Sequence, residues 1–144
     1  MSADKVFVDT NILIYAYDTS AGEKHETARK LLSDLWKDQA GVISTQVLQE
    51  FYVNITRKIP KPLQIASARV IVEDLCNWDV VTIETETILA AIDLQQINAL
   101  SFWDAMILAA AASAGAGVLM TEDLNHGQVI SHVRICNPFI KPVK

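Results

Sequence analysis

The chain alternates between two kinds of hydrophobic pattern. Short runs of consecutive apolar residues, such as 6–8 and 118–120, are typical of strands buried on both faces. Longer stretches place apolar residues three or four positions apart, as at Ala28, Leu32 and Leu35, and this spacing predicts amphipathic helices. The expected strands cover residues 5–10, 41–45, 80–83, 118–121 and 132–139. The expected helices cover residues 11–18, 25–38, 47–58, 62–78, 84–100 and 101–117.

The order of these elements predicts the fold class. Strands alternate with helices along the whole chain, which is typical of an α/β fold with a mainly parallel sheet and helices on both faces. The sequence has no internal repeat, low-complexity tract or linker, so we expect residues 1–144 to form a single domain. In such sheets, binding sites form beyond the carboxyl ends of the strands.

The composition bears on the cellular compartment of the protein, the state of its cysteines and its affinity for nucleic acids. No apolar run is long enough to cross a membrane, and the opening MSADK lacks the features of a signal peptide, so we expect a cytoplasmic protein. The two cysteines, Cys76 and Cys136, form no close-spaced motif; we expect reduced, buried thiols and no cysteine-based zinc site. The net charge of −5 argues by itself against a protein that grips nucleic-acid phosphates.

Four acids fall at the starts or inner faces of elements around one end of the expected sheet. Asp9 ends the first strand, and Asp123 follows the fourth. Asp104 has apolar helical neighbours, which places it on the buried face of its helix, and Glu50 borders the apolar stripe of another. Clustered carboxylates repel one another unless a divalent cation binds them, and oxygen ligands suit Mg²⁺ or Mn²⁺. Such a centre activates water and neutralises phosphate charge.

Each acid also has an ordinary structural explanation. Asp104 is the third residue after Ser101, so the two side chains could form a capping box. Asp9 could cap the following helix, Glu50 could be a plain surface acid, and Asp123 could be a loop residue. The sequence leaves these alternatives open.

Four stretches together resemble PIN domains, most closely VapC-type toxins of type II toxin–antitoxin pairs. They read FVDTNILIYAYD, STQVLQEFYVNITRK, SFWDAMILAAAASAGAGVLMTEDL and VRICNPF. The resemblance implies a three-layer α/β/α sandwich and a metal-dependent endoribonuclease that uses one or two Mg²⁺ or Mn²⁺ ions. It implies that the catalytic and metal-binding residues are Asp9, Glu50, Asp104 and Asp123, supported by Thr10, Asn11 and Thr121.

The resemblance also implies partners. These are an RNA substrate, a second copy of the chain, and a cognate antitoxin that lays a helix or tail across the acidic groove. The antitoxin could contact NILIYAY and EFY, although core packing explains both segments equally well. Weak RNA contacts are assigned to the basic cluster Arg57, Lys58 and Lys61, for which the alternative is a solvated helix end.

Two residues near the expected site receive lesser roles. We expect Glu122 to face solvent and Trp103 to lie in the core or an interface, although its ring could instead stack on a base.

Rival functions fit the sequence less well. A haloacid-dehalogenase phosphatase needs an aspartate at the position of Asn11, and a dinucleotide-binding protein needs a glycine-rich turn where the chain reads DTNIL. A receiver-like phosphoacceptor domain needs an early acidic pair and a lysine after a late strand, whereas the chain offers a lone Asp9 and MTEDL. The strongest rival is a non-catalytic PIN-like module that binds metal for stability or docks a protein.

Overall fold

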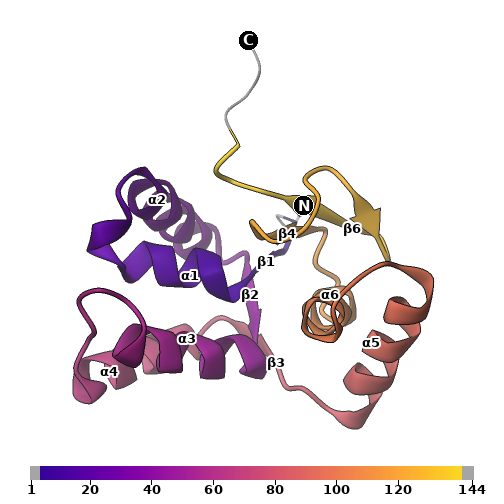
Figure 1. Ribbon diagram of the computed structural model, residues 1–144, viewed down its shortest axis with the longest axis horizontal. Coiled ribbons are helices and arrows are strands. Elements are labelled where there is room, and N and C mark those ends of the chain that lie inside the picture. Colours follow the sequence, from indigo (N-terminus) through magenta and orange to yellow (C-terminus); the bar gives the residue numbers. More distant parts are fainter. Residues whose placement is uncertain (1–3, 141–144) are drawn as a thin grey trace.

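The computed structural model describes residues 4–140, in which six strands form one sheet (Figure 1). The spatial order is β3-β2-β1-β4-β6-β5, and every neighbouring pair is parallel except β5 and β6. The strands are β1 (Val6–Val8), β2 (Gly41–Ser44), β3 (Asp79–Val81), β4 (Val118–Met120), β5 (Val129–Ile130) and β6 (Val133–Cys136). The first three and last four residues of the expected 1–144 domain, and most of MSADK, lie outside the described part.

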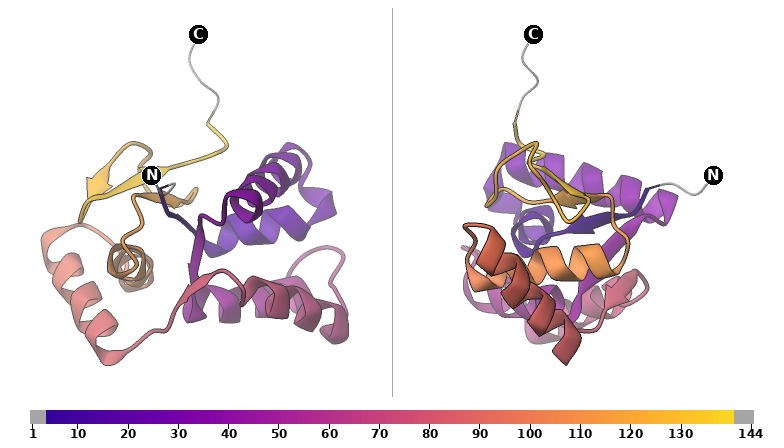
Figure 2. Two further views of the ribbon diagram at one scale, coloured as in Figure 1. Left: turned by 180° about the vertical axis from the view of Figure 1, so that it is seen from behind. Right: turned by 90° about the vertical axis from the view of Figure 1, so that its right-hand side faces the viewer.

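Helices cover both faces of this sheet, which confirms the expected α/β/α arrangement. As Figures 1 and 2 show, α1 to α4 lie on one side, and α5 and α6 lie on the other. The helices are α1 (Thr10–Tyr17), α2 (Glu23–Asp38), α3 (Thr45–Arg57), α4 (Ile65–Leu75), α5 (Thr85–Ile97) and α6 (Phe102–Ser113), with a 3₁₀ turn at Thr19–Ala21.

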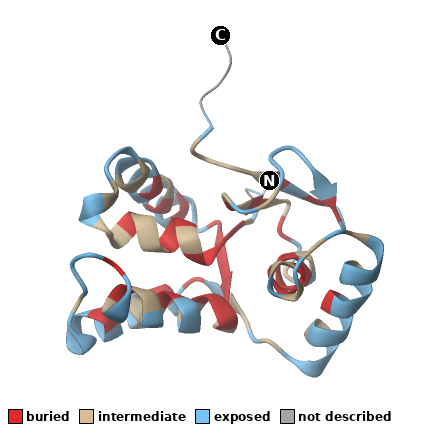
Figure 3. Cartoon of the chain, in the orientation of Figure 1, coloured by how far each residue is buried: buried red, intermediate tan, exposed pale blue. Residues whose placement is uncertain are grey.

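The core lies between the sheet and these two helix layers (Figure 3). Its largest fully buried side chains include Phe7, Ile12, Phe51 and Leu119. Helix α6 is apolar on nearly every side because it is enclosed by the sheet and α5, and its small alanines allow both neighbours to approach closely. The expected apolar segments NILIYAY and EFY contribute mainly to this core, although Tyr15 and Tyr52 stay partly exposed.

Strand pairing sets the location of the site. In β1, Val8 lies opposite Met120 of β4, and the Asp9 N–H donates to the Met120 carbonyl at 3.0 Å. Both strands therefore end at the same edge of the sheet, and Asp9 and Thr121 are the first residues beyond it. Strand β2 ends beside them at Ser44, whose hydroxyl accepts from the Val47 N–H and caps α3.

Some expected boundaries were wrong. Residues 129–130, which are not among the expected strands, form β5 and pair with β6 across Ser131 and His132. Both turn residues have positive φ, 51° and 67°, which suits the twist of a two-residue hairpin. Strand β1 ends before Asp9, helix α4 begins three residues after Pro62, and α5 ends at Ile97.

The cysteines are free thiols but are not buried as expected: Cys76 is exposed and Cys136 is half-buried. Within residues 4–140, no helix combines the length and apolar character that crossing a bilayer requires.

Candidate functional site

A cavity of about 310 Å³ opens at the carboxyl end of the sheet. Helices α1, α3 and α6 and the loop after β4 supply its wall, so four separate parts of the chain meet there. All four acids singled out from the sequence line it. The lining residues are Asp9, Thr10, Asn11, Ile14, Gln46, Glu50, Asn54, Trp103, Asp104, Ile107 and Asp123.

Asp9 lies deepest and is held by two hydrogen bonds. One carboxylate oxygen accepts from the Thr10 N–H at 2.7 Å and caps α1; the other accepts from the Thr121 hydroxyl at 2.8 Å. The residue is only 6% exposed, and burial raises the pKa of Asp9 to about 6, even though both hydrogen bonds lower it. Asp9 therefore caps α1, as its structural explanation predicts, and it also lines the cavity.

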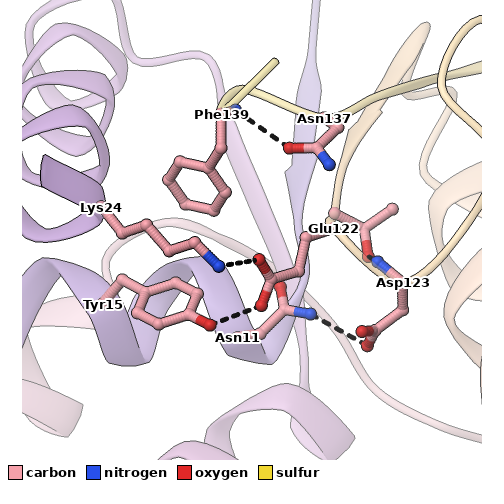
Figure 4. A network of polar contacts seen from close by, with 8 residues as sticks. Asn11, Tyr15, Lys24, Glu122, Asp123, Asn137 and Phe139 are labelled. Carbon is pink, nitrogen blue, oxygen red and sulfur yellow. Dashed lines mark hydrogen bonds and ion pairs between the residues drawn. The ribbon is translucent and has the colours of Figure 1, made fainter. Parts of the chain in front are cut away.

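Asp123 is fixed by the loop that follows β4. Its N–H donates to the Thr121 hydroxyl at 3.1 Å, so Thr121 ties together two acids that are far apart in sequence. The Asn11 side chain donates to an Asp123 carboxylate oxygen at 2.9 Å (Figure 4). Partial desolvation raises the pKa of Asp123, the negative charges of Asp104 and Glu122 raise it further, and the bond from Asn11 opposes this.

Glu50 reaches the cavity from the second turn of α3. Gln46 donates its amide N–H to one carboxylate oxygen at 2.7 Å, and the Thr10 hydroxyl donates weakly to the other at 3.4 Å. Sequence analysis missed Gln46 as a site residue. The available signal was its position four residues before Glu50 on the same helix face.

Asp104 enters the cavity from the first turn of α6. Its N–H donates to the Ser101 hydroxyl at 3.1 Å, so Ser101 caps the helix as suggested. The reciprocal bond of a capping box, from the Ser101 N–H to the Asp104 carboxylate, is not formed between these described residues, and the carboxylate lines the cavity instead. We expected its neighbour Trp103 in the core or an interface; at 64% exposed it does not lie in the core, and the interface position stays a prediction.

Glu122 does not face solvent, contrary to the expectation. Its side chain is 21% exposed and pairs with Lys24 of α2 at 2.7 Å. The Tyr15 hydroxyl donates to its other oxygen, and the Lys24 ammonium lies 5.0 Å from the Tyr15 ring centroid and 5.3 Å from that of Phe139. Figure 4 shows Glu122 turned toward this group and Asp123 turned toward Asn11. The Lys24 ammonium therefore neutralises the Glu122 carboxylate, and the Tyr15 hydroxyl donates a hydrogen bond to it. The side chain of Asp123 lines the cavity instead.

The atoms of the four acids that could bind a metal are carboxylate oxygens, which suit a hard divalent cation. Two buried oxygens in the cavity wall, Asn11 Oδ1 and Gln46 Oε1, also lack a hydrogen-bond partner. Within residues 4–140, however, no three Asp, Glu, His or Cys side chains are placed closely enough to hold an ion. Binding of an ion by three of these acids therefore requires at least one side chain to move from its position in this structure.

The basic cluster lies away from these acids. Arg57 ends α3 and Lys58 caps it, seven residues and about 10 Å along the helix from Glu50. Lys61 follows in the next loop, and all three residues are exposed. None of these three residues is among those that line the cavity.

Comparison with known proteins identifies the family. The model of the PIN domain family matches residues 6–130. The chain belongs to the PIN domain family. The matched range includes all four cavity acids of this PIN domain. A separate comparison with curated protein sequences found no match to the chain.

Solved structures share the fold of this PIN domain at low sequence identity. A toxin–antitoxin complex from Klebsiella pneumoniae is 24% identical, covers 94% of this chain and 98% of its own, and has a TM-score of 0.68. DNA-bound VapBC from Salmonella typhimurium is 21% identical over 92% and 97%, with a TM-score of 0.65. VapC20 from Mycobacterium tuberculosis, described as a toxin that cleaves the sarcin–ricin loop, is 20% identical over 80% and 87%, with a TM-score of 0.61.

Proposed function

We propose that this PIN domain is a divalent-metal-dependent endoribonuclease that acts as the toxin of a toxin–antitoxin pair. The observation that carries the proposal is the meeting of four acids from separate elements in one cavity at the carboxyl end of a parallel sheet. The fold shared with VapC20 and with two toxin–antitoxin complexes supports the choice of RNA and of the toxin role.

The proposed roles follow from how each acid is held. Asp9, Asp104 and Asp123 bind one or two Mg²⁺ or Mn²⁺ ions, and Glu50 binds directly or through water. When bound, the cation supplies an activated water and neutralises phosphate charge. Thr121 and Thr10 fix Asp9, and Asn11 fixes Asp123, so half of the site is in place before the ion arrives.

RNA recognition in this proposal depends little on net charge. The exposed Trp103 ring stands at the cavity rim beside Asp104, where it can stack on an unpaired base. Arg57, Lys58 and Lys61 contribute weak phosphate contacts farther along α3. A protein with a charge of −5 binds RNA weakly in general, so recognition relies on the shape of a looped or folded RNA.

The proposal includes protein partners. A cognate antitoxin covers the acidic cavity with a helix or tail and places a basic side chain among the carboxylates. A second copy of the chain forms a homodimer, and the exposed apolar residues Ile88, Leu89 and Ile92 of α5 supply a surface of suitable character. We place this activity in the cytoplasm, where cellular RNA is the substrate.

The decisive experiment incubates the purified protein with total RNA in Mg²⁺, in Mn²⁺ and in EDTA. We expect discrete cleavage that requires metal. The Asp104→Asn variant should lose at least a thousandfold in rate, because one of the charged oxygens that hold the ion becomes neutral. The matched control is Asp93→Asn, which removes an exposed acid of α5 and should cleave normally.

Other outcomes would redirect the proposal. Cleavage that survives in Asp104→Asn, or in EDTA, would contradict the assignment of the site. Metal binding without cleavage of any RNA, or absence of both, would favour a non-catalytic PIN-like module that binds metal or docks a protein. The spacing of the acids favours the docking form of this second candidate, because no three are placed to hold an ion within the described residues.

A further inference from the structure

Two side-chain amides in the cavity wall have the same unusual environment. Gln46 of α3 donates its Nε2–H to Glu50, and Asn11 of α1 donates its Nδ2–H to Asp123. An ionised carboxylate only accepts hydrogen bonds, so each amide must direct its nitrogen toward the acid. The orientation of both amides is thereby fixed by chemistry, and the amide oxygen of each is the atom left over.

Both leftover oxygens are buried and have no hydrogen-bond partner. They are two of the three such side-chain atoms within residues 4–140; the third is the Trp78 indole nitrogen, at the opposite end of the sheet. Gln46 as a whole is only 8% exposed. A buried acceptor without a donor is unfavourable, and native proteins rarely keep one unless a ligand, ion or water satisfies it.

The missing partner of Gln46 must be a hydrogen-bond donor that is also attracted by acids. Gln46 Oε1 belongs to the same planar amide group that contacts Glu50, so a donor that reaches it lies beside that carboxylate. The hydration shell of a divalent cation meets both requirements. Mg²⁺ keeps several waters when carboxylates bind it, and each of those waters has protons to donate.

We propose that Gln46 is a positioning residue, which holds Glu50 through its amide N–H and accepts a hydrogen bond from a water molecule of the bound cation through its amide oxygen. The inference rests on the proposed metal-dependent function and adds to it a residue from outside the acidic set. Asn11 has the same arrangement with Asp123, so one amide orients an acid on each side of the cavity. Partners of this kind typically change metal affinity by 10- to 100-fold when they are removed.

The test compares the unaltered protein with Gln46→Met, which keeps the length of the side chain but removes both amide atoms. The matched control is Gln49→Met, which changes an exposed glutamine of the same helix that does not line the cavity. Isothermal titration calorimetry with Mn²⁺, without RNA, gives the affinity, and thermal unfolding in EDTA gives the stability of the metal-free protein.

We expect Gln46→Met to weaken Mn²⁺ binding about tenfold or more, while its Tm in EDTA equals or exceeds that of the unaltered protein. The second result follows because the substitution removes a buried acceptor that has no partner until the ion binds. A residue that serves only packing would give the opposite pair of results, with a lower Tm and unchanged affinity, and that outcome would overturn the inference.

Two further outcomes separate this inference from the proposed function. Absence of Mn²⁺ and Mg²⁺ binding by the unaltered protein would overturn the proposed function and the role of Gln46 together. Normal Mn²⁺ affinity in Gln46→Met, combined with loss of RNA cleavage, would overturn the inference alone. In that case the donor to Gln46 would be a ribose 2′-hydroxyl of the substrate.

Discussion

The two ends of the central sheet are built on opposite principles. At the amino end, Gly41 packs directly against the Trp78 ring, Trp78 meets Trp36 edge to face at 5.5 Å, and Lys5 pairs with Asp79 at 2.7 Å. At the carboxyl end, four acids line a cavity, and two buried amide oxygens have no partner.

This difference separates stability from function along the strand direction. Apolar contacts and close backbone approach at the amino end lower the free energy of the folded state. Like charges and unpaired acceptors at the carboxyl end raise it, and they are retained where a ligand can compensate them. Substitutions at the two ends should therefore change stability with opposite signs.

The largest change in stability should come from Gly41→Ala at the amino end. An added Cβ would lie 2.4 Å from Cε3 of Trp78, closer than atoms can approach, so the tryptophan or the strand must move. We expect the free energy of unfolding to fall by about 3 kcal/mol in urea denaturation. The cavity acids should keep their relative positions in the fraction that remains folded.

Gly117→Ala is the matched control, because Gly117 also lies at the amino end but an added Cβ there meets nothing within 4 Å. It should be neutral or slightly stabilising. Equal destabilisation by both glycine variants would show that close packing against Trp78 is not the cause.

The second change should have the opposite sign. In metal-free protein, Asp9→Asn should raise the free energy of unfolding by about 2 kcal/mol at pH 8, because it removes a buried charge. The pKa of Asp9 is about 6 in the folded protein, against an ordinary value of 3.8. The gap is equivalent to about 3 kcal/mol, from which about 1 kcal/mol is subtracted for a weakened hydrogen bond.

The pH dependence checks the cause. Because the folded pKa is raised, the favourable contribution of protonated Asp9 is present below pH 3.8 and is lost as the pH rises through about 6. Urea denaturation in EDTA at pH 4 should therefore show little difference between Asp9→Asn and the unaltered protein. A stabilisation that is the same at pH 4 and pH 8 would contradict this explanation.

Two smaller losses of stability compare the ion pairs at the two ends of the sheet. Lys24→Met removes the ion pair to Glu122, which lies next to a cavity acid but serves stability. We expect a loss of about 1 kcal/mol, since Glu122 is partly buried and keeps only its bond from Tyr15.

Lys5→Met provides the comparison at the amino end. The Lys5–Asp79 pair has the same 2.7 Å separation but is about half exposed on both sides, so its loss should cost less than about 0.5 kcal/mol. A larger effect for Lys5 than for Lys24 would show that burial of the carboxylate does not set the size of the loss.

Local sequence patterns predicted much of the fold. The expected strands correspond to five of the six strands of the sheet, and Ser101 marked the start of α6. The hairpin of β5 was missed because Val129–Ile130 is too short for a recognisable period and depends on two residues with positive φ.

The sequence by itself determined the order of the elements and placed Asp9, Glu50, Asp104 and Asp123 at the ends or inner faces of elements, because periodicity and capping act over a few residues. Only the tertiary structure decided which neighbours those acids have. Glu122 and Asp123 are adjacent in sequence, yet one binds Lys24, 98 positions away, and the other binds Asn11, 112 positions away. Such pairings arise from strand order and helix packing, which bring distant side chains together and leave no periodic signal along the chain.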